Sequence, residues 1–466
     1  MFWLELRRNP SMPYIRQLCE HLRLKILGGD LAAGARLPST RDLALQLRVS
    51  RNVVREAYAQ LAAEGYLESR RGAGMFVAAG ARLPARTAPT APAPAPGPEP
   101  PGRAVIDFRT GAPALELVPR ALLARRFREA CLDAPAAGYG YGSPGGHPAL
   151  RQALAVYLAR TRGVHCSPEC ILITTGTAEA IYLAARLLLG PRTGVVVEDP
   201  LHAHFQDTLR FCGADLLPIP GDGAGLQVAL LDRVRVAPAF VLASPSHAFP
   251  CGATLPVQRR IELLRFGAER GCPIVEDDHE SEFHYGATAA SSLQGLNPDG
   301  VIYLGTFSKV FSPSLRIGYM VLPARFMARI RELKYLVNNH ASTFDQMVVA
   351  RLLQSGELER HVAAMKRVYR KRQEALLQAL AEAFGGRCAC SGTSAGLHLL
   401  ATFAGRAFTP ALLEALAQAG VLAHPVERHA IRKGEHLDQL ILGFGNLPES
   451  RIREGVRRMR GVLEPD

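Results

Sequence analysis

The sequence is poor in the features that mark membrane, secreted and zinc-stabilised proteins. No apolar run is long enough to span a bilayer, and the opening stretch MFWLELRRNP becomes charged too early for a signal peptide. The nine cysteines show no paired spacing, and the nearest couples, Cys388 with Cys390 and Cys166 with Cys170, stand alone. No internal repeat is visible. We therefore expect a cytoplasmic protein with reduced thiols, no metal site and no membrane partner.

Length, composition and charge narrow the class of protein further. A chain of 466 residues is too long for one typical core, so two or three domains are expected. Its 43 glycines and its apolar content are typical of an α/β globular protein and not of a disordered or fibrous one. The formal net charge of +13 favours a polyanionic partner, although charge alone says nothing about fold.

One segment, RLPARTAPTAPAPAPGPEPPGRA, consists almost entirely of Ala, Pro and Gly. Prolines favour extended polyproline II, so the segment is predicted to be a semi-stiff spacer. We therefore expect a domain at residues 1–80, a linker at 81–104 and a larger domain at 105–466. The larger domain alternates β-branched runs, such as CILITTG and CPIVEDD, with amphipathic helical stretches. This alternation predicts βα units around a largely parallel sheet.

The first 80 residues carry the signals of three helices and a hairpin. PYIRQLCEHLRLKIL has apolar residues at helical spacing and is followed by two glycines. Ser39, three residues before Asp42, is predicted to cap a second helix, and Ser50 a third that ends at Gly65. LESRRGAGMFV then reads as a hairpin with glycines at its tip. Together these elements predict a winged helix-turn-helix.

In a winged helix-turn-helix the third helix enters the major groove of DNA with its N-terminus leading. Its first turns are expected to contact bases or phosphates, while the second helix and the wing position the DNA backbone. The alternative is a small helical interaction module with solvated arginines, but three capped elements and a basic wing favour DNA. The predicted DNA-binding residues are Arg41, Arg51, Asn52, Arg55, Arg70 and Arg71. The segment resembles the winged helix of the GntR regulators, whose hallmark LPSxRxLAxxLxVSRxxVxxAYxxLxxEGYL it matches nearly throughout.

Four stretches of the larger domain suggest one common ligand. In ITTGTAEA a strand gives way at Gly176 to a helix whose first residues, Thr177 and Ala178, offer N–H groups to an anion. Alone this turn is weak evidence for an anion site, because strand–Gly–helix turns occur in any α/β protein. In IVEDDHESEF, Asp277 ends an apolar strand, where a carboxylate can hold a protonated pyridine nitrogen. The alternative role for Asp277 is a helix cap.

The stretch GTFSKVFSPSLRIGY contains one lysine, Lys309, in an apolar setting. Burial favours the neutral amine, which can form a Schiff base with an aldehyde, whereas most single lysines are solvated surface groups. Thr306, Ser308 and Arg316 can bind a phosphate. A fourth stretch, YGYGSPGGHPALR, places Tyr141 before a Gly/Pro turn. Pyridoxal 5'-phosphate (PLP) is a ligand that all four stretches could share.

On these motifs, residues 105–461 resemble a fold-type I, aspartate-aminotransferase-like domain, and the whole chain resembles the MocR/GabR regulators. The resemblance implies an α/β domain with a mainly parallel sheet and a small C-terminal α+β subdomain. It also implies a head-to-tail homodimer, with Tyr141 reaching the phosphate of the neighbouring subunit. The implied cofactor contacts are Lys309 as the Schiff-base lysine, Asp277 at the pyridine nitrogen, and Gly176, Thr177, Thr306 and Arg316 around the phosphate.

The sequence departs from the family pattern at the ring of the cofactor. The family's EDPGYxG reads EDPLHAH, which puts Leu201 and His202 at the Gly-Tyr positions. Its EDDYDSEF reads EDDHESEF, so His279 replaces a tyrosine. An imidazole can stack on an aromatic ring and donate a hydrogen bond, so both histidines are expected to contact the cofactor ring. The alternative is that these positions have drifted because the pocket is no longer selected for catalysis.

Two further departures concern the substrate. PSHQ(F/Y)P reads PSHAFP, with Ala248 for glutamine, and LRLGF reads LILGF, with Ile441 where the family has the arginine that clamps an α-carboxylate. A buried carboxylate without a cation is costly, so Ile441 argues against amino-acid binding. Arg428 and Arg432 lie near Ile441 in the sequence and are candidates to replace the carboxylate-binding arginine.

Three functions remain open from the sequence. The first is a nucleoid-associated regulator that binds operator DNA and senses PLP or a small amine or amino acid, with little or no turnover. The second is a working aminotransferase with an appended DNA-binding domain, which the loss of the arginine disfavours. The third is a regulator whose larger domain only dimerises, which the retention of Lys309 and Asp277 disfavours. PLP itself or a decarboxylated amine is the effector that Ile441 favours.

Overall fold

The contacts within the chain form two compact units, Met1–Pro100 and Pro101–Asp466. The computed structural model describes residues 6, 12–81, 105–286 and 291–464. Nearly all of the predicted linker lies outside the described residues. No helix within those ranges is both long and apolar enough to cross a membrane.

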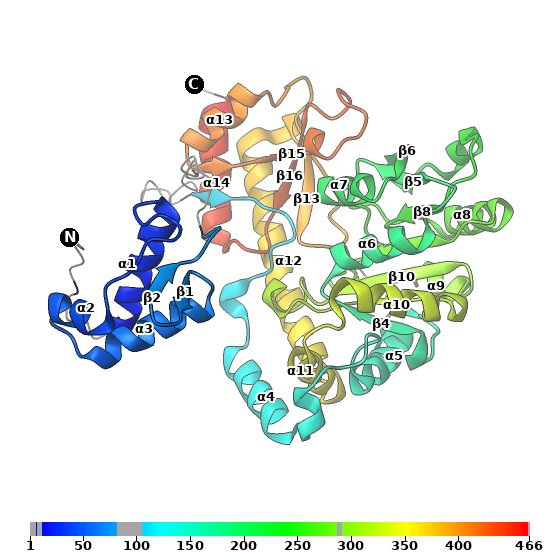
Figure 1. Cartoon of the computed structure of the whole chain (residues 1–466). Coiled ribbons are helices and arrows are strands. Elements are labelled where there is room, and N and C mark those ends of the chain that lie inside the picture. Colours follow the sequence, from blue (N-terminus) through cyan, green and yellow to red (C-terminus); the bar gives the residue numbers. More distant parts are fainter. Residues whose placement is uncertain (1–5, 7–11, 82–104, 287–290, 465–466) are drawn as a thin grey trace. The chain divides into compact units, whose positions relative to one another are not determined.

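The N-terminal unit is a three-helix fold with a two-stranded wing (Figure 1). Its elements are α1 (Tyr14–Gly28), α2 (Thr40–Leu47), α3 (Arg51–Ala63), β1 (Leu67–Arg70) and β2 (Gly74–Val77), with β1 and β2 antiparallel. The predicted caps form: Ser39 accepts the backbone N–H of Asp42 at 3.2 Å, and Ser50 accepts that of Val53 at 3.4 Å. The core is apolar and includes Leu22 and Leu61, each 0% exposed, so the helices are held by burial of their inner faces.

The larger unit is built on an eight-stranded sheet in the order β4-β11-β10-β9-β8-β5-β6-β7 (Figure 1). In that order the strands are Ile171–Thr174, Gly318–Val321, Val301–Thr306, Ile274–Asp278, Phe240–Ala243, Gly194–Asp199, Asp215–Asp222 and Gly225–Leu226. Neighbours from β10 to β6 are parallel, whereas β11 runs antiparallel to β10 and β4, and β7 antiparallel to β6. The mainly parallel sheet expected from the alternating sequence is confirmed.

Helices cover both faces of this sheet, which explains why its strands are continuous apolar runs. One face packs against α6 (Thr177–Leu188), α7 (Ala203–Phe211) and α10 (Met327–Asn338). The other packs against α5 (Pro148–Arg162), α8 (Val257–Arg270), α9 (Leu293–Leu296) and α11 (Thr343–Gln354). Helix α4 (Arg120–Asp133) packs beside α11.

A smaller subdomain follows the sheet and has its own core. Its antiparallel sheet has the order β12-β13-β16-β15, with bounds Ala389–Ser391, His398–Thr402, Gln439–Gly443 and His424–Pro425. Helices α12 (Glu357–Phe384), α13 (Pro410–Gln418) and α14 (Glu449–Leu463) pack on it (Figure 1). Strand β14 (Val421–Leu422) pairs with β3 (Ile106–Asp107), so the start of the unit is tied to its C-terminal part. The predicted small α+β subdomain is thus present.

Short 3-10 helices, η1 to η8, occupy several connections. In chain order they are Leu115–Leu117, Ala136–Tyr139, Pro168–Cys170, Val228–Arg233, Pro313–Leu315, Ala324–Phe326, Gly385–Arg387 and Val426–Arg428.

Candidate functional site

A cavity of about 210 Å³ lies where several parallel strands of the large sheet end. Side chains just after β4, β5, β8, β9 and β10 reach it, as expected for a ligand site at the carboxyl ends of parallel strands. The sequence-predicted residues that line it are Gly176, Thr177, His202, Asp277, His279, Thr306, Ser308, Lys309 and Arg316. Sequence segments more than 130 residues apart therefore converge as the motifs suggested.

Two predicted cofactor residues do not line this cavity. Ala178 lies in the first turn of α6, beyond the lining residue Thr177. Tyr141 is 90% exposed and stands edge-on to the ring of His340 at 6.3 Å. Because Tyr141 was expected to serve the neighbouring subunit, its contact with a phosphate stays a prediction.

One end of the cavity has the chemistry of an anion site. Gly176 caps α6 with φ of 128°, and a Cβ there would lie 3.6 Å from the guanidinium nitrogens of Arg316. The positive φ favours glycine here, whereas Arg316 would be only in ordinary van der Waals contact with a Cβ. The Thr306 hydroxyl, also in the cavity lining, donates to the Ser308 hydroxyl at 3.0 Å. Helix N–H groups, two hydroxyls and a guanidinium are the donors that a phosphate requires.

A buried ion pair anchors the helix that forms this anion site. Glu179, in the first turn of α6, accepts the backbone N–H of Thr175 at 2.5 Å and the Lys334 ammonium at 2.7 Å. Lys334 is 0% exposed. Burial alone would raise the pKa of Glu179, but the charge and hydrogen bond of Lys334 and the Thr175 donors lower it overall. The carboxylate therefore stays ionised and holds the N-terminus of α6 in place.

The cavity lining also includes an acid with one unpartnered oxygen. Asp277 is 3% exposed; its Oδ2 lies 2.9 Å from His279 Nδ1, and its Oδ1 is buried with no hydrogen-bond partner among the described residues. Burial alone would lower the pKa of His279, but the charge and hydrogen bond of Asp277 raise it to about 9. His279 is thus a cation at neutral pH. An orphaned carboxylate oxygen beside it fits a protonated ring nitrogen.

The second histidine differs from the first in charge. Burial, together with the positive charges of His279 and Lys309, lowers the pKa of His202 to about 4. Its ring lies 5.2 Å from Phe205 and 5.1 Å from Phe249, both of which also line the cavity. His202 is therefore a neutral, largely apolar wall, whereas His279 is a charged donor.

Lys309 reaches across to a segment that the sequence motifs did not single out. Its Nζ donates to the backbone carbonyl of Gly111 at 2.6 Å. Gly111 has φ of 66°, and a Cβ there would lie 2.2 Å from Nζ, so any larger residue would displace the amine. Glycine at this position keeps the lysine free to project into the cavity.

Beneath the cavity lies a buried acid between two histidines. Glu280, a lining residue, accepts the backbone N–H of Leu397 at 3.1 Å and lies 3.5 Å from His398 and 3.8 Å from His247. Burial lowers the pKa of His247 to about 3, so that ring is neutral. These three side chains are close enough together to ligate a metal ion, a grouping that the cysteine-based expectation of no metal site did not consider.

The position at which the family resemblance expects a carboxylate-binding arginine is apolar. Ile441, on β16, is 0% exposed and packs in a cluster with Phe249, Leu400 and Val426. Neither considered substitute lines the cavity: Arg428 is exposed, and Arg432 donates to the carbonyl of Pro218 at 2.6 Å.

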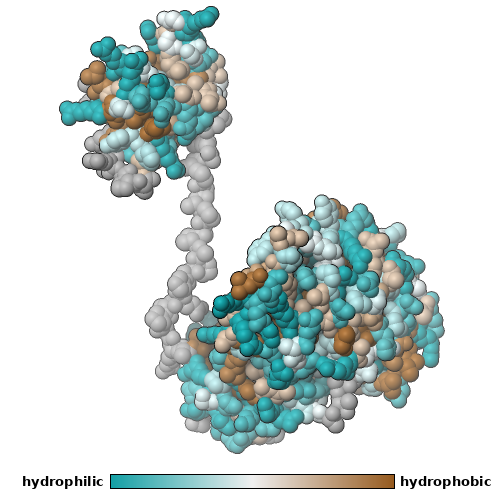
Figure 2. Space-filling view, turned by 90° about the horizontal axis from the view of Figure 1, so that it is seen from below, coloured by the Kyte–Doolittle hydropathy of each residue, from teal (hydrophilic) through white to brown (hydrophobic). Residues whose placement is uncertain are grey.

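The predicted DNA-binding residues lie on the surface of the N-terminal unit. Arg41, Arg51, Asn52, Arg55, Arg70 and Arg71 are all exposed. Figure 2 shows hydrophilic side chains, in teal, projecting from this unit on the face drawn. Arg51 donates to the Thr40 hydroxyl at 3.3 Å, while Arg70 pairs with Glu68 at 2.6 Å and lies over the Phe76 ring. The tip of α3 and Arg71 thus present cations to solvent.

Comparison with known proteins bears on both units. Residues 15–77 match the family "Bacterial regulatory proteins, gntR family", and residues 103–433 match "Aminotransferase class I and II". A winged helix fused to an aminotransferase-like domain defines a class of DNA-binding regulators. The chain belongs to this family of HTH-type transcriptional regulators, in which a GntR-type winged helix precedes an aminotransferase-like domain.

Two relatives and one solved structure illustrate the match. The chain is 33% identical over 475 residues to the probable rhizopine catabolism regulatory protein MocR of Rhizobium meliloti, covering 99% of this chain and 96% of that one. It is 30% identical to the pyridoxine biosynthesis transcriptional regulator PdxR of Corynebacterium glutamicum, covering 81% and 82%. The α-aminoadipate aminotransferase LysN of Thermus thermophilus, solved with N-(5'-phosphopyridoxyl)-L-leucine, superposes with a TM-score of 0.72 at 28% identity, covering 77% of this chain and 92% of that one.

Proposed function

We propose that this regulator holds PLP in the 210 Å³ cavity and binds operator DNA through its winged helix, with a small effector changing the affinity for DNA. The unpartnered buried oxygen of Asp277, on the same cavity wall as the cationic His279 and within a cavity that Lys309 enters, is the observation that carries the proposal. When bound, PLP would supply an aldehyde that reacts reversibly with primary amines and a ring that withdraws electrons.

Different residues of the chain would bind different parts of this cofactor. Lys309 would bind the aldehyde carbon, and Asp277 would accept the proton of the pyridine nitrogen. The N-terminus of α6, with Thr177 and Arg316, would bind the phosphate. His279 would donate a hydrogen bond to the ring, and His202 would pack against it. That LysN was solved with a phosphopyridoxyl group supports the assignment.

We further propose that the domain turns over little or no amino acid. Ile441 offers no charge to an α-carboxylate, and no arginine other than the phosphate-side Arg316 lines the cavity within the described residues. The alternative is an aminotransferase with an appended DNA-binding domain, which the likeness to aminotransferase structures favours. Steady release of keto acid from PLP-loaded protein would decide for that alternative.

The DNA side of the proposal rests on exposed cations at the start of α3. Arg51, Asn52 and Arg55 would contact bases or phosphates of double-stranded operator DNA, and Arg41, Arg70 and Arg71 its backbone. A head-to-tail dimer would place Tyr141 at the neighbouring subunit's phosphate and bring two winged helices to paired half-sites. An effector can change DNA binding only through different affinities for two states of such a dimer.

Absorbance spectroscopy tests the cofactor assignment. Incubation with PLP should turn the wild-type protein yellow, and Lys309→Ala should remove the protein-bound absorbance while the far-UV circular dichroism stays unchanged. Lys371→Ala, which removes an exposed lysine of α12, is the matched control and should stay yellow. A wild-type protein that stays colourless after incubation would overturn the cofactor proposal.

Selection from random duplexes, followed by mobility shift, tests the DNA assignment. Arg51→Ala should abolish specific shifts of the selected duplex, because Arg51 stands in the first turn of the helix that enters the groove. Arg16→Ala removes a side chain on α1 that is 70% exposed and should leave the shift intact. An unchanged footprint with Arg51→Ala would contradict the assignment.

A further inference from the structure

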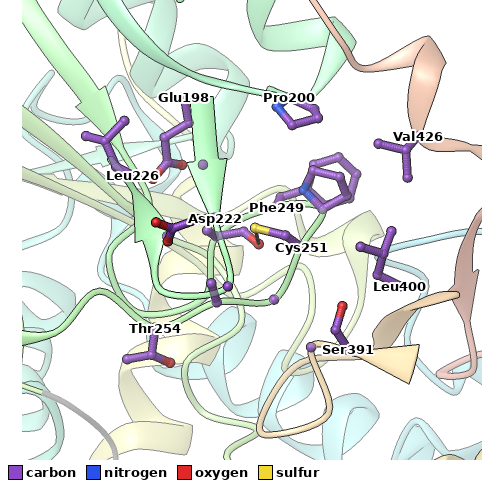
Figure 3. Close-up of a pocket in the computed structure, with 18 of the residues that line it drawn as sticks. Glu198, Pro200, Asp222, Leu226, Phe249, Cys251, Thr254, Ser391, Leu400 and Val426 are labelled. Atoms are coloured by element: carbon purple, nitrogen blue, oxygen red, sulfur yellow. Dashed lines mark hydrogen bonds between the residues drawn. The ribbon is translucent and has the colours of Figure 1, made fainter. Parts of the chain in front are cut away.

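A second, larger cavity of about 470 Å³ lies beside the first (Figure 3). It opens between the large sheet, which contributes the ends of β5 and β6 and the segment 248–254, and the small subdomain, which contributes segment 391–394. Phe249 lines both cavities. Two quoted motifs, EDPLHAH and PSHAFP, supply part of its wall, although neither motif predicted a second cavity.

The charged groups in this wall are acidic. Three carboxylates line the cavity, and no lysine or arginine does so within the described ranges. Asp222 is neutralised by Arg259, with both oxygens 2.7 Å from the guanidinium. Asp199 accepts the backbone N–H groups of Ile431 at 2.7 Å and Arg432 at 3.1 Å. Two of the three acids therefore already have partners.

Glu198 is different because one of its oxygens has no partner. It is 5% exposed; Oε2 accepts the backbone N–H of Ser244 at 3.2 Å, while Oε1 is buried and makes no hydrogen bond with any described residue. A buried carboxylate oxygen without a donor is costly unless something pairs with it. Burial, together with the charge of Asp277, raises the pKa of Glu198 to about 7, although the Ser244 hydrogen bond lowers it. The acid thus lacks a cation.

The part of the wall that lies opposite the acids includes an apolar patch beside polar side chains of the small subdomain. In Figure 3, Glu198 and Asp222 stand on one side of the cavity, and Leu400 and Val426 stand on the other. Leu400 and Val426 pack with the fully buried Ile441. A ligand carboxylate placed there would lie between apolar side chains and acids, and His436 is the one basic side chain among the described lining residues.

We propose that this second cavity is the effector site, and that it binds a small organic cation without a carboxylate, such as an alkylamine, whose charge pairs with Glu198. The claim that this ligand regulates DNA binding rests on the function proposed above, whereas binding itself does not. Glu198 also links the two cavities: its backbone partner Ser244 lines the first, and the charges of Asp277 and His279 act on it. A cation at Glu198 would therefore change the electrostatic field at the cofactor ring.

Calorimetry on the full chain, prepared without PLP, tests binding alone. The probes are n-butylamine, butyltrimethylammonium, 4-aminobutyrate and butyrate. Butyltrimethylammonium keeps the charge but cannot condense with an aldehyde, so its binding reports the cavity and not cofactor chemistry. We expect both cations to bind, 4-aminobutyrate to bind about 10- to 100-fold more weakly, and butyrate to give no heat.

Variants at Glu198 identify the counter-ion. Glu198→Gln, which keeps the shape and removes the charge, should weaken both cations about 10- to 100-fold, and Glu198→Asp should give an intermediate loss. Glu269→Gln, an exposed acid on α8, is the matched control and should bind like wild type. Circular dichroism of each variant establishes that it is folded.

The outcomes separate this inference from the function proposed above. Absence of cation binding, equal affinity for 4-aminobutyrate, or unchanged affinity in folded Glu198→Gln would each overturn the cation site and leave the PLP assignment standing. Conversely, a protein that binds the cations but stays colourless with PLP would support the cation site and overturn the cofactor proposal. Addition of butyltrimethylammonium to the PLP-loaded protein should shift its absorbance maximum in wild type and not in Glu198→Gln; a shift in neither would refute the coupling.

Discussion

The buried pair of Lys334 and Glu179 gives a sharp prediction about stability. Replacing Lys334 by Met would keep most of the side-chain volume but leave the Glu179 carboxylate buried without its cation. Breaking a buried pair by removing one partner typically costs about 3 to 5 kcal/mol. Because Glu179 would keep donors from Thr175 and Asn338, we expect the lower end, about 3 kcal/mol.

Folding stabilises the charged form of Glu179 and destabilises the charged form of Lys334. This difference predicts the stability of the double variant. Pairing lowers the pKa of Glu179 despite burial, whereas burial lowers the pKa of Lys334 by more than Glu179 raises it. The lowered pKa of Lys334 governs the net stability of the pair. Lys334 depends on one carboxylate, whereas Glu179 also has other donors. The pair as a whole therefore adds little, and Lys334→Met with Glu179→Gln should recover most of the loss.

The pH dependence has a definite sign. In wild type the pKa of Glu179 is lowered on folding, so its contribution is present above its unfolded pKa and is lost as pH falls through its folded pKa. Without Lys334 the folded pKa should rise, so the deficit of Lys334→Met should be largest near pH 8 and shrink towards pH 5.

Urea denaturation of the full chain, followed by far-UV circular dichroism, measures these effects. A second readout is the apparent affinity for PLP, which should fall in Lys334→Met because Glu179 anchors the N-terminus of α6 at the anion site. A loss below about 1 kcal/mol, or a double variant no more stable than the single one, would refute the reasoning.

Two further predictions concern the cavities. Glu198, with its pKa raised to about 7 by burial and facing Asp277 and His279, should lose its proton when a cation binds. Calorimetry in buffers of different ionisation enthalpy should therefore find that butyltrimethylammonium binding releases more protons at pH 6 than at pH 8. Proton release that does not fall with pH would contradict this prediction. Gly111→Val should weaken PLP binding about tenfold or more, because its Cβ would lie 2.2 Å from Lys309 Nζ; unchanged affinity in a spectrophotometric titration would count against the lysine's assigned role.

Much of the fold followed from local patterns in the sequence. The caps at Ser39 and Ser50 mark the starts of α2 and α3, because their hydroxyls must accept N–H groups within three residues. The antiparallel insertion of β11 between β4 and β10 was not predicted. An apolar run of four residues does not encode its direction, which depends on neighbours far away in the chain.

The candidate site was predictable where its residues lie in motifs at strand ends. Asp277 and Lys309 follow apolar strands, so their convergence could be expected from a parallel sheet. Gly111 was missed because it meets Lys309 across 198 positions of sequence, and no local pattern marks it. The role of Glu198 was missed for a different reason: it opens the motif EDPLHAH, but its unpartnered oxygen is visible only in three dimensions.

Ile441 and Glu198 together have one electrostatic consequence. Ile441 stands where the resembling family places a cation, and the neighbouring cavity keeps an unpaired acid, Glu198. A site built this way discriminates against carboxylates by repulsion and desolvation, and in favour of amines by attraction. Because that cavity lies between the large sheet and the small subdomain, a bound cation would contact both. Any regulation must come from a difference in that contact between two arrangements of the subdomains, since a ligand that binds both equally shifts neither.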